Sequence, residues 1–316
     1  MSNHMLKIIR GGMLTTVQDI GRYGYQRYGV TVSGAVDTWS LKVANTLIGN
    51  EENCAGLEIT IMGPQIEFCR DSFISICGGD LSPLLDGEKL PMWEGVSVRR
   101  GQILSFGGRI SGCRAYLAVS GGIDVPEVMG SRSTFLRGSI GGFEGRPLKE
   151  GDVLCGGAAK GAARLMRLRP GCRPAFDGSQ RELRVIMGPQ AHHFTEEALK
   201  LFLSGIYTVS INADRMGIRL DGGVLQHRHG ADILSEAVSS GSIQVPAHGQ
   251  PIILLAESQT TGGYAKIATV ITVDLSYVAQ CIPGDKVFFS PVTLEFARRL
   301  LMEREKSLHR GLVLIN

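Results

Sequence analysis

The sequence predicts a mainly β protein with a few short helices. Its apolar runs are short, and most are bounded by Gly, Pro, Asn or Asp, as strands in globular proteins usually are. Glycine accounts for 42 of the 316 residues, roughly twice its usual share, and it supplies the positive φ angles that tight turns require. The five-residue core IMGPQ occurs at 61–65 and again at 186–190, which indicates that one fold is used twice.

The apolar runs give eleven strand candidates. In chain order they are 57–62, 65–69, 72–77, 96–106, 113–119, 183–187, 206–211, 243–245, 251–256, 267–273 and 286–289. Three helices are predicted: Asp37 is suited to cap 38–48, Thr195 is suited to cap 196–203, and Pro291 precedes a third helix. The strands do not alternate regularly with helices, as a parallel α/β sheet would require.

The two halves also share an order of turn signals, MGPQ then Gly-Gln then Gly-Asp. These lie at 62–65, 101–102 and 151–152 in the first half, and at 187–190, 249–250 and 284–285 in the second. We therefore predict two related β domains, 5–165 and 166–316, the second with a C-terminal helix. The IMGPQ copies are expected to mark the same strand-to-turn position in each domain, because proline lacks an amide donor and fixes φ.

Composition and charge exclude several classes of protein. A net charge of +3 is too small to indicate nucleic-acid binding. No apolar run approaches the roughly 18 residues of a membrane span, and the N-terminus does not resemble a signal peptide. The seven cysteines form no CxxC pair and are odd in number, which favours reduced thiols. We expect a cytoplasmic protein with neither a nucleic-acid nor a membrane partner.

Common enzyme signatures are absent from the sequence. It contains no GxxxxGK[ST], no strand-to-helix GxGxxG, no HExxH and no GxSxG, which argues against the familiar NTPases, dinucleotide dehydrogenases, zinc proteases and α/β-hydrolases. His227 and His229 would lie on one side of a strand, but no Cys or carboxylate set completes a metal site around them. We predict no metal on this chain.

Polar residues gather in four glycine-rich stretches, where backbone N–H groups are able to approach an anion. The stretches are 15–22 with 29–37, 77–80, 120–124 with 130–134, and 259–266. Purely structural roles remain open for three of these residues. Asp37 is also suited to cap a helix, Asp80 is suited to a turn, and Arg132 is suited to an exposed surface. The last stretch, QTTGGYAK, is the strongest candidate, since an amide, two hydroxyls, a phenol and an ammonium surround a double glycine.

Several longer motifs resemble a known family. In order, between about residues 5 and 297, they are TTVQDIGRYGYQRYGVTVSGAVD, NTLIGN, LEITIMGPQ, CGGD, RAYLAVSGGIDVP, MGSRST, GGFEGRPLKEGD, DRMGIRL and GSIQVPAHGQPIILLAESQTTGGYAKIATVI, followed by PGD. Together they resemble the biotin-dependent carboxyltransferase family. The resemblance implies two related cyclophilin-like β-barrel domains. The sequence departs from the family at Glu257, where Asp is more common, and at Ala265, where Pro is common.

The resemblance also implies a function. The family includes the C subunit of 5-oxoprolinase, and a stand-alone chain of this length is most similar to that branch. The implied reaction is the ATP-dependent opening of 5-oxo-L-proline to L-glutamate, with Mg-ATP as cosubstrate, the A and B subunits of that enzyme as partners and no biotin attached to this chain. Two alternatives stay open. One is a regulatory protein that binds a partner and antagonises a kinase inhibitor; the other is the carboxyltransferase component of a biotin-dependent, urea carboxylase-like enzyme.

The implied chemistry assigns hypothetical roles to residues of these stretches. Asp80, Lys266 and Tyr264 are the catalytic candidates, with Asp80 as the base for water and Lys266 as a stabiliser of oxyanion or phosphate charge. Arg132 and Arg215 are candidate clamps for a carboxylate or phosphate. The other candidate binding residues are Ser33, Asp37, Gln244, Gln259, Thr260, Thr261, Gly262 and Gly263.

Overall fold

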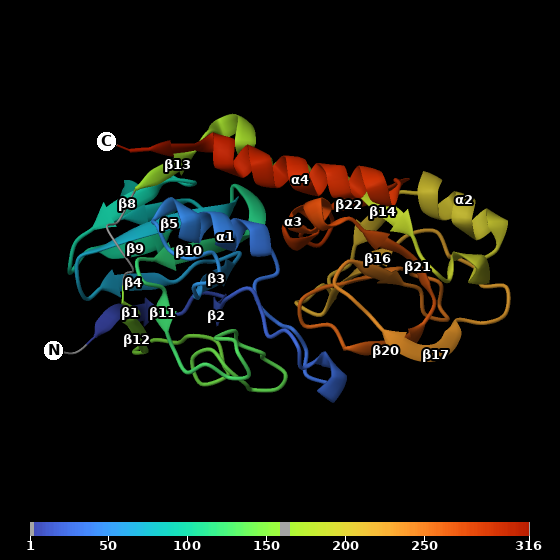
Figure 1. Cartoon of the computed structure of the whole chain (residues 1–316), viewed down its shortest axis with the longest axis horizontal. Coiled ribbons are helices and arrows are strands. Elements are labelled where there is room, and N and C mark those ends of the chain that lie inside the picture. The colour runs from blue at the N-terminus through green and yellow to red at the C-terminus, as the bar shows by residue number, and fades with distance from the viewer. Residues whose placement is uncertain (1–2, 159–164, 316) are drawn as a thin grey trace. The chain divides into compact units, whose positions relative to one another are not determined.

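The computed structural model describes residues 3–158 and 165–315 (Figure 1). Strands dominate these ranges, which confirms the predicted mainly β class. The contacts divide the chain into two compact units. The first comprises the chain up to Tyr23, Ser33–Phe176 and the chain from Lys306 onward, and the second comprises Gly24–Val32 and Asp177–Glu305. The predicted ranges 5–165 and 166–316 thus differ from these units at 24–32, 166–176 and the C-terminal segment.

The first unit contains two large antiparallel sheets. The first has the order β11 (Ile123–Asp124), β12 (Val153–Gly156), β1 (His4–Arg10), β4 (Gln65–Phe68), β9 (Ile103–Phe106), β6 (Pro83–Leu85), β7 (Glu88–Lys89). The second has the order β2 (Leu14–Gln18), β3 (Gly56–Thr60), β10 (Ser111–Val119), β5 (Ser72–Asp80), β8 (Gly95–Val98). Helix α1 (Thr38–Leu47) packs on β5 and β10, and β13 (Met166–Leu168) pairs with β23 (Leu312–Leu314).

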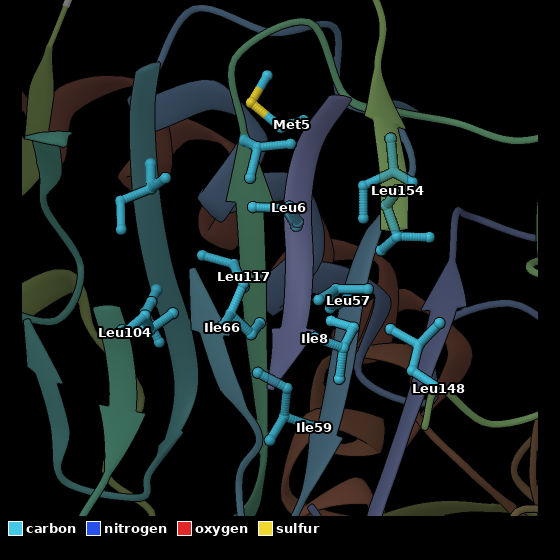
Figure 2. Close-up of a cluster of buried hydrophobic side chains, with 14 of the residues drawn as sticks. Met5, Leu6, Ile8, Leu57, Ile59, Ile66, Leu104, Leu117, Leu148 and Leu154 are labelled. Carbon is cyan, nitrogen blue, oxygen red and sulfur yellow. The ribbon is translucent and has the colours of Figure 1, made fainter. Parts of the chain in front are cut away.

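The core of the first unit is built from alternate residues of both sheets. Leu6 and Ile8 are completely buried on β1, and they share one apolar cluster with Leu57 and Ile59 of β3. Figure 2 shows these side chains with Leu117 of β10 in the same cluster. Because successive strand residues point to opposite faces, this spacing of two fixes which face of each strand is buried.

The second unit contains a closed barrel. Its strand order is β14 (Gln180–Met187), β21 (Lys266–Val270), β18 (Ser242–Gln244), β19 (Ile252–Leu254), β16 (Gly217–Asp221), β15 (Tyr207–Val209), β22 (Lys286–Pro291), closing where β14 and β22 pair in parallel. A separate two-stranded sheet joins β17 (Asp232–Ala237) to β20 (Thr261–Tyr264). The remaining described helices are α2 (Glu196–Ser204), α3 (Leu275–Ala279) and α4 (Leu294–Gly311).

The predicted elements are present in both units. Each of the eleven strand candidates overlaps a strand, and 96–106 is divided into β8 and β9 by the turn around Gly101. The three predicted helices are α1, α2 and α4. Asp37 accepts a hydrogen bond from the Ser40 backbone N–H, and Thr195 accepts one from that of Ala198, so both predicted caps are confirmed.

The Gly-Asp turn of the first unit has a distinctive hydrogen-bond pattern. Gly151 adopts φ +88° and donates its N–H to the Ile8 carbonyl at 2.9 Å, while the Ile8 N–H donates to the Asp152 carbonyl at 2.8 Å. The Asp152 side chain accepts from the Lys149 N–H at 2.8 Å. The turn therefore starts β12 in register with β1.

The Gly-Asp turn of the second unit repeats this pattern. Gly284 adopts φ +92° and donates to the Val209 carbonyl at 2.9 Å, and the Val209 N–H donates to the Asp285 carbonyl at 2.8 Å. The Asp285 side chain accepts from the Ile282 N–H at 3.1 Å. Two turns with the same residues, conformation and bonds support the internal duplication that the sequence predicts.

The two IMGPQ copies are alike in one respect and different in another. Both Gly-Pro pairs follow the end of a strand, β3 in the first copy and β14 in the second. The first copy leads directly into β4 and lines a cavity of ≈ 570 Å³ together with Arg10 and Phe106. The second leads into a 3₁₀ turn (Ala191–His193) before α2, and a Cβ on Gly188 would lie 2.2 Å from the Lys266 carbonyl oxygen.

Replacement of either turn glycine by alanine tests the repeated turn. Gly151→Ala and Gly284→Ala meet no neighbouring atom, so their cost is the positive φ alone. We expect each to lower the free energy of unfolding by about 1 to 2 kcal/mol, measured by urea denaturation. Gly171→Ala is the control, since Gly171 also has open space but no positive φ. Equal stability of all three variants would contradict the conclusion that the positive φ angles of Gly151 and Gly284 require glycine.

Candidate functional site

The stretch 259–266 places one charged side chain inside the second unit. Lys266 is the first residue of β21, and only 7% of its surface is exposed. Its ammonium contacts a carboxylate oxygen of Glu236 at 2.5 Å and the Ala237 carbonyl at 3.3 Å. Both acceptors belong to β17, which pairs with β20 (Figure 1). Burial of an ammonium group is costly unless acceptors such as these pair with it.

Gln190 of the second IMGPQ copy joins this group. Its side-chain carbonyl accepts from the Lys266 backbone N–H at 3.3 Å, and its side-chain amide donates to Glu236 Oε1 at 2.6 Å. The same oxygen of Glu236 therefore receives the Lys266 ammonium and the Gln190 amide. The hydrogen bond from Lys266 lowers the pKa of Glu236.

Two more glutamines extend the polar cluster. Gln244 is almost completely buried on β18, where a shift in register places it opposite Lys266. Gln259 donates to the Gln244 side-chain oxygen at 3.1 Å, and the Gln244 amide donates to the Tyr264 carbonyl at 3.4 Å. A Cβ on Gly262 would lie 2.4 Å from the Gln244 amide nitrogen. The first of the two glycines is thus needed for Gln244 to fit.

Most of the remaining residues of the stretch are more exposed, and Ala265 is buried. The Tyr264 side chain is 41% exposed, Thr261 is exposed, and Thr260 accepts a hydrogen bond from the Val238 N–H through its carbonyl. Gly263 would meet the Ser235 hydroxyl at 3.3 Å if it carried a Cβ. The Ala265 N–H donates to the Ala231 carbonyl at 3.0 Å, a bond that proline in this position would lose.

Arg215 has an internal carboxylate partner. Its Nε donates to Glu257 Oε1 at 2.6 Å, and the two residues are 5% and 3% exposed. The Glu257 N–H also donates to the Arg215 carbonyl. Glu257, where the family more often has Asp, therefore holds the guanidinium that was predicted to clamp a substrate anion.

In the first unit, Asp19 connects two stretches that are far apart in sequence. Its carboxylate accepts from the Gly21 N–H at 2.8 Å, the Ser131 hydroxyl at 2.8 Å, the Arg132 N–H at 2.6 Å and the Ser133 hydroxyl. Asp19 lies in one of the glycine-rich stretches, but its sequence context predicted no role for it. The carboxylate holds SRST against the segment that follows β2.

Arg22 lies beside this carboxylate. The side chain is completely buried, and it donates to the Val128 carbonyl at 2.9 Å and the Ser133 carbonyl at 2.9 Å. Burial lowers the pKa of Arg22, and the charge of Asp19 opposes that effect. The Ser33 hydroxyl donates to the Thr134 carbonyl at 2.7 Å, so Ser33 belongs to the same network.

Arg132 faces acidic side chains of its own unit. Its guanidinium donates to the Val125 carbonyl at 3.1 Å and to Glu127 at 3.2 Å, and it lies 3.9 Å from Asp124. Its side chain is partly exposed. An incoming anion would therefore compete with two carboxylates for this arginine.

Asp37 and Asp80 occupy local structural positions. Asp37 is buried and caps α1, and its own N–H donates to the Tyr116 hydroxyl at 2.8 Å. Asp80 ends β5 and accepts from the Ser82 N–H at 2.8 Å. The described hydrogen bonds bring neither carboxylate into the Asp19 network. Asp37 is a helix cap and Asp80 lies in a turn, which are the structural alternatives that the sequence left open.

Two members of the Lys266 cluster were not predicted. Glu236 was missed altogether, and Gln190 was expected to have an architectural role alone. The sequence does mark Gln190, because it is the last residue of the second IMGPQ copy. In the part of the chain that the structure describes, no three His, Cys, Asp or Glu side chains are placed to hold a metal ion. Among the described helices, none has the length and apolar character required to cross a membrane.

Comparison with known proteins identifies the family. The barrel, and the strands that position Lys266 and its three glutamines, lie within residues 28–291, which match the family model "Carboxyltransferase domain, subdomain A and B". The chain belongs to this carboxyltransferase domain family, as its motifs indicated.

The relatives are of two kinds. The chain is 39% identical to the C subunit of 5-oxoprolinase from Escherichia coli (strain K12) over 304 residues, which cover 96% of each protein. It is 36% identical to urea amidolyase of Saccharomyces cerevisiae over 93% of this chain but 17% of that protein. The solved structure of K. lactis urea amidolyase matches 97% of this chain and 20% of its own, with 33% identity and a TM-score of 0.92.

Removal of the Asp19 carboxylate should destabilise the first unit. Asp19→Ala leaves buried donors without their acceptor, so we expect a loss of about 3 to 5 kcal/mol in the free energy of unfolding. Urea denaturation measures it. Asp177→Ala, at an exposed position, should change stability by about 0.5 kcal/mol or less. A similarly small loss of stability in Asp19→Ala would contradict the conclusion that the Asp19 carboxylate holds the two loops together.

The Lys266 contact should be visible in the titration of Glu236. Because the folded-state pKa of Glu236 is lowered, the pair stabilises the fold above the unfolded-state pKa, and this contribution disappears as pH falls through the folded-state pKa. Carbon NMR of the Glu236 carboxyl should show that Lys266→Met raises its pKa toward the ordinary range of a glutamate. Lys200→Met, at an exposed position of α2, should leave it unchanged. An unaltered titration in Lys266→Met would refute the pairing.

Proposed function

We propose that this chain is the C subunit of an ATP-dependent 5-oxoprolinase, which opens 5-oxo-L-proline to L-glutamate together with A-like and B-like subunits and Mg-ATP. The supporting comparison is the relative named as the C subunit of 5-oxoprolinase, which matches this chain over 96% of both lengths. The structural observation that supports the proposal is the buried Lys266 ammonium. It lies among glutamine side chains and is paired with the partly exposed carboxylate of Glu236.

The chemistry of ring opening requires charge stabilisation. A lactam carbonyl is a poor electrophile, and transfer of the γ-phosphoryl group to its oxygen makes the carbon open to attack by water. The C–N bond then breaks, and the ring nitrogen takes up a proton and leaves as the amine of the product. A second water hydrolyses the remaining acyl phosphate to the carboxylate of glutamate and inorganic phosphate. Negative charge on the phosphoryl and carbonyl oxygens must be stabilised by cations and N–H donors.

Residues of the second unit meet this requirement. Lys266 supplies the positive charge, and Gln190 and Gln244 supply amide donors around it. Gln259 orients Gln244, while Tyr264, Thr260, Thr261 and Gly263 lie on the more exposed part of the same stretch. Arg215 is less suited to clamp a substrate carboxylate, because Glu257 already occupies its guanidinium.

The first unit offers fewer groups for the reaction. Asp80 is proposed as the base for water, since this residue is partly exposed at the end of β5. Arg132 would serve as an anion clamp after separation from Glu127. Ser33 and Asp37 are proposed to shape this part of the unit through their hydrogen bonds to Thr134 and to α1.

A second candidate function is the carboxyltransferase component of a biotin-dependent, urea carboxylase-like enzyme. The similarity to urea amidolyase over more than nine-tenths of this chain favours it. In that reaction the Lys266 cluster would face the carboxyl group in transfer. A regulatory role as antagonist of a kinase inhibitor would instead require partner binding without turnover.

Reconstitution tests the proposal. The chain is purified with its A-like and B-like partners, and release of ADP and glutamate is measured with 5-oxo-L-proline. Lys266→Ala should lower kcat by about 100-fold or more, as loss of an oxyanion-stabilising group does elsewhere. Lys200→Ala, at an exposed position, should retain full activity.

The outcomes separate the candidates. Absence of 5-oxoproline-dependent turnover with both partners present would refute the 5-oxoprolinase assignment. Transfer from carboxybiotin would support the second candidate, and partner binding without turnover would support the regulatory one. Full activity of Lys266→Ala in the assembled complex would refute the assigned site.

A further inference from the structure

We propose that the Lys266 ammonium and the Gln190 side-chain amide form an anion-binding pair that Glu236 occupies in the free chain and vacates for a ligand. The ligand class is a carboxylate or a phosphoryl group, whose oxygen replaces that of Glu236. The identity of that anion as part of the substrate rests on the proposed function; the pair itself is a property of this chain.

The two donors converge on a single oxygen. Glu236 Oε1 lies 2.5 Å from the Lys266 nitrogen and 2.6 Å from the Gln190 amide nitrogen. An ammonium and an amide directed at one point form a site for any small oxyanion. Glu236 thus shows, within the protein, where the oxygen of a bound anion lies and which groups contact it.

The donors are held firmly. Lys266 lies in the barrel, where β21 pairs with both β14 and β18. Gln190 is fixed through the Lys266 N–H, and Gly188, two residues earlier, packs so closely on the Lys266 carbonyl that a Cβ would lie 2.2 Å from it. The second IMGPQ copy therefore sets the distance between the two donors.

The occupying carboxylate is held less firmly. The Glu236 side chain is 42% exposed, whereas Lys266 is buried. Its strand, β17, pairs with β20 in a separate two-stranded sheet, and the register between them shifts between Asp232 and Glu236. Leu234 on β17 is 93% exposed. The Glu236 side chain is therefore able to rotate into water with little loss of packing, because a partly exposed side chain makes few buried contacts.

The exchange conserves the main interactions. A buried ammonium without a partner is costly, so the contact with Glu236 stabilises the folded chain while no ligand is bound. An incoming anion restores the same two contacts, and the released Glu236 regains its hydration. Because the site is free in only a fraction of the molecules, the apparent Kd of the ligand equals its intrinsic Kd divided by that fraction. Removal of the Glu236 charge should therefore lower the apparent Kd.

Binding of inorganic phosphate to the full chain without partners tests the pair. Isothermal titration calorimetry with phosphate should give an apparent Kd at least about tenfold lower in Glu236→Gln than in the unaltered chain. Glu236→Ala should show the same direction. Acetate, titrated in parallel, tells whether the pair selects a phosphoryl group or a carboxylate.

Three further variants assign the effect to the pair. Adding Lys266→Met to Glu236→Gln should abolish the gained binding, and adding Gln190→Leu should weaken it several-fold. Glu197→Gln removes the same charge at an exposed position of α2 and should leave phosphate binding unchanged. Circular dichroism confirms that each variant is folded, and Gln190→Leu provides the test if Lys266→Met is not.

An unchanged Kd in Glu236→Gln would overturn the inference. Phosphate binding that stays equally tight when Lys266→Met or Gln190→Leu is added to Glu236→Gln would also overturn it. Its failure is distinct from that of the proposed function. Phosphate or acetate binding with the expected pattern, but no 5-oxoproline-dependent turnover in the complex, would leave the anion site intact and refute the enzyme assignment. Turnover in the complex, together with anion binding that Glu236→Gln does not change, would support the enzyme assignment and refute the anion-binding pair.

Discussion

The pairing of β14 with β21 determines how Gln190 lies against Lys266. Met187 at the end of β14 lies opposite Ala268, and the next residue, Gly188, donates its N–H to the Ile267 carbonyl. The chain then turns at Pro189 and places Gln190 beside Lys266. Because strand register is fixed by the buried faces of the barrel, a slip of one residue would turn Lys266 away from both Gln190 and Glu236.

Asp19 and Lys266 are equally buried but have different partners. The carboxylate of Asp19 is surrounded by donors that other parts of the same unit supply, and it holds two loops together. Lys266 is as deeply buried, yet its carboxylate partner is partly exposed and lies on a small separate sheet. A buried carboxylate that accepts from several buried donors is held rigidly, whereas a buried charge with a partly exposed partner is suited to ligand binding. This difference favours the second unit as the place where a ligand binds.

Local patterns predicted the elements of the fold, and long-range pairing determined the site. Asp37 and Thr195 were recognisable as caps because a cap needs nothing beyond the next three residues. Glu236 carries no such signal, because its strand is mostly exposed and its partner Lys266 lies 30 residues further along the chain. The carboxylate that engages Arg215 is likewise 42 residues away. No spacing rule connects residues that meet only through barrel closure and the pairing of β17 with β20.

The two repeated motifs differ in how closely their copies resemble each other. The Gly-Asp turns make the same bonds in both units, and each precedes a strand. The IMGPQ copies differ in their surroundings. Gln65 of the first begins β4 beside a surface cavity, whereas Gln190 of the second leaves the strand and binds both Lys266 and Glu236. The 3₁₀ turn that follows Gln190 frees its side chain from the strand pattern. A motif that marks a strand end in one unit therefore positions a charged group in the other.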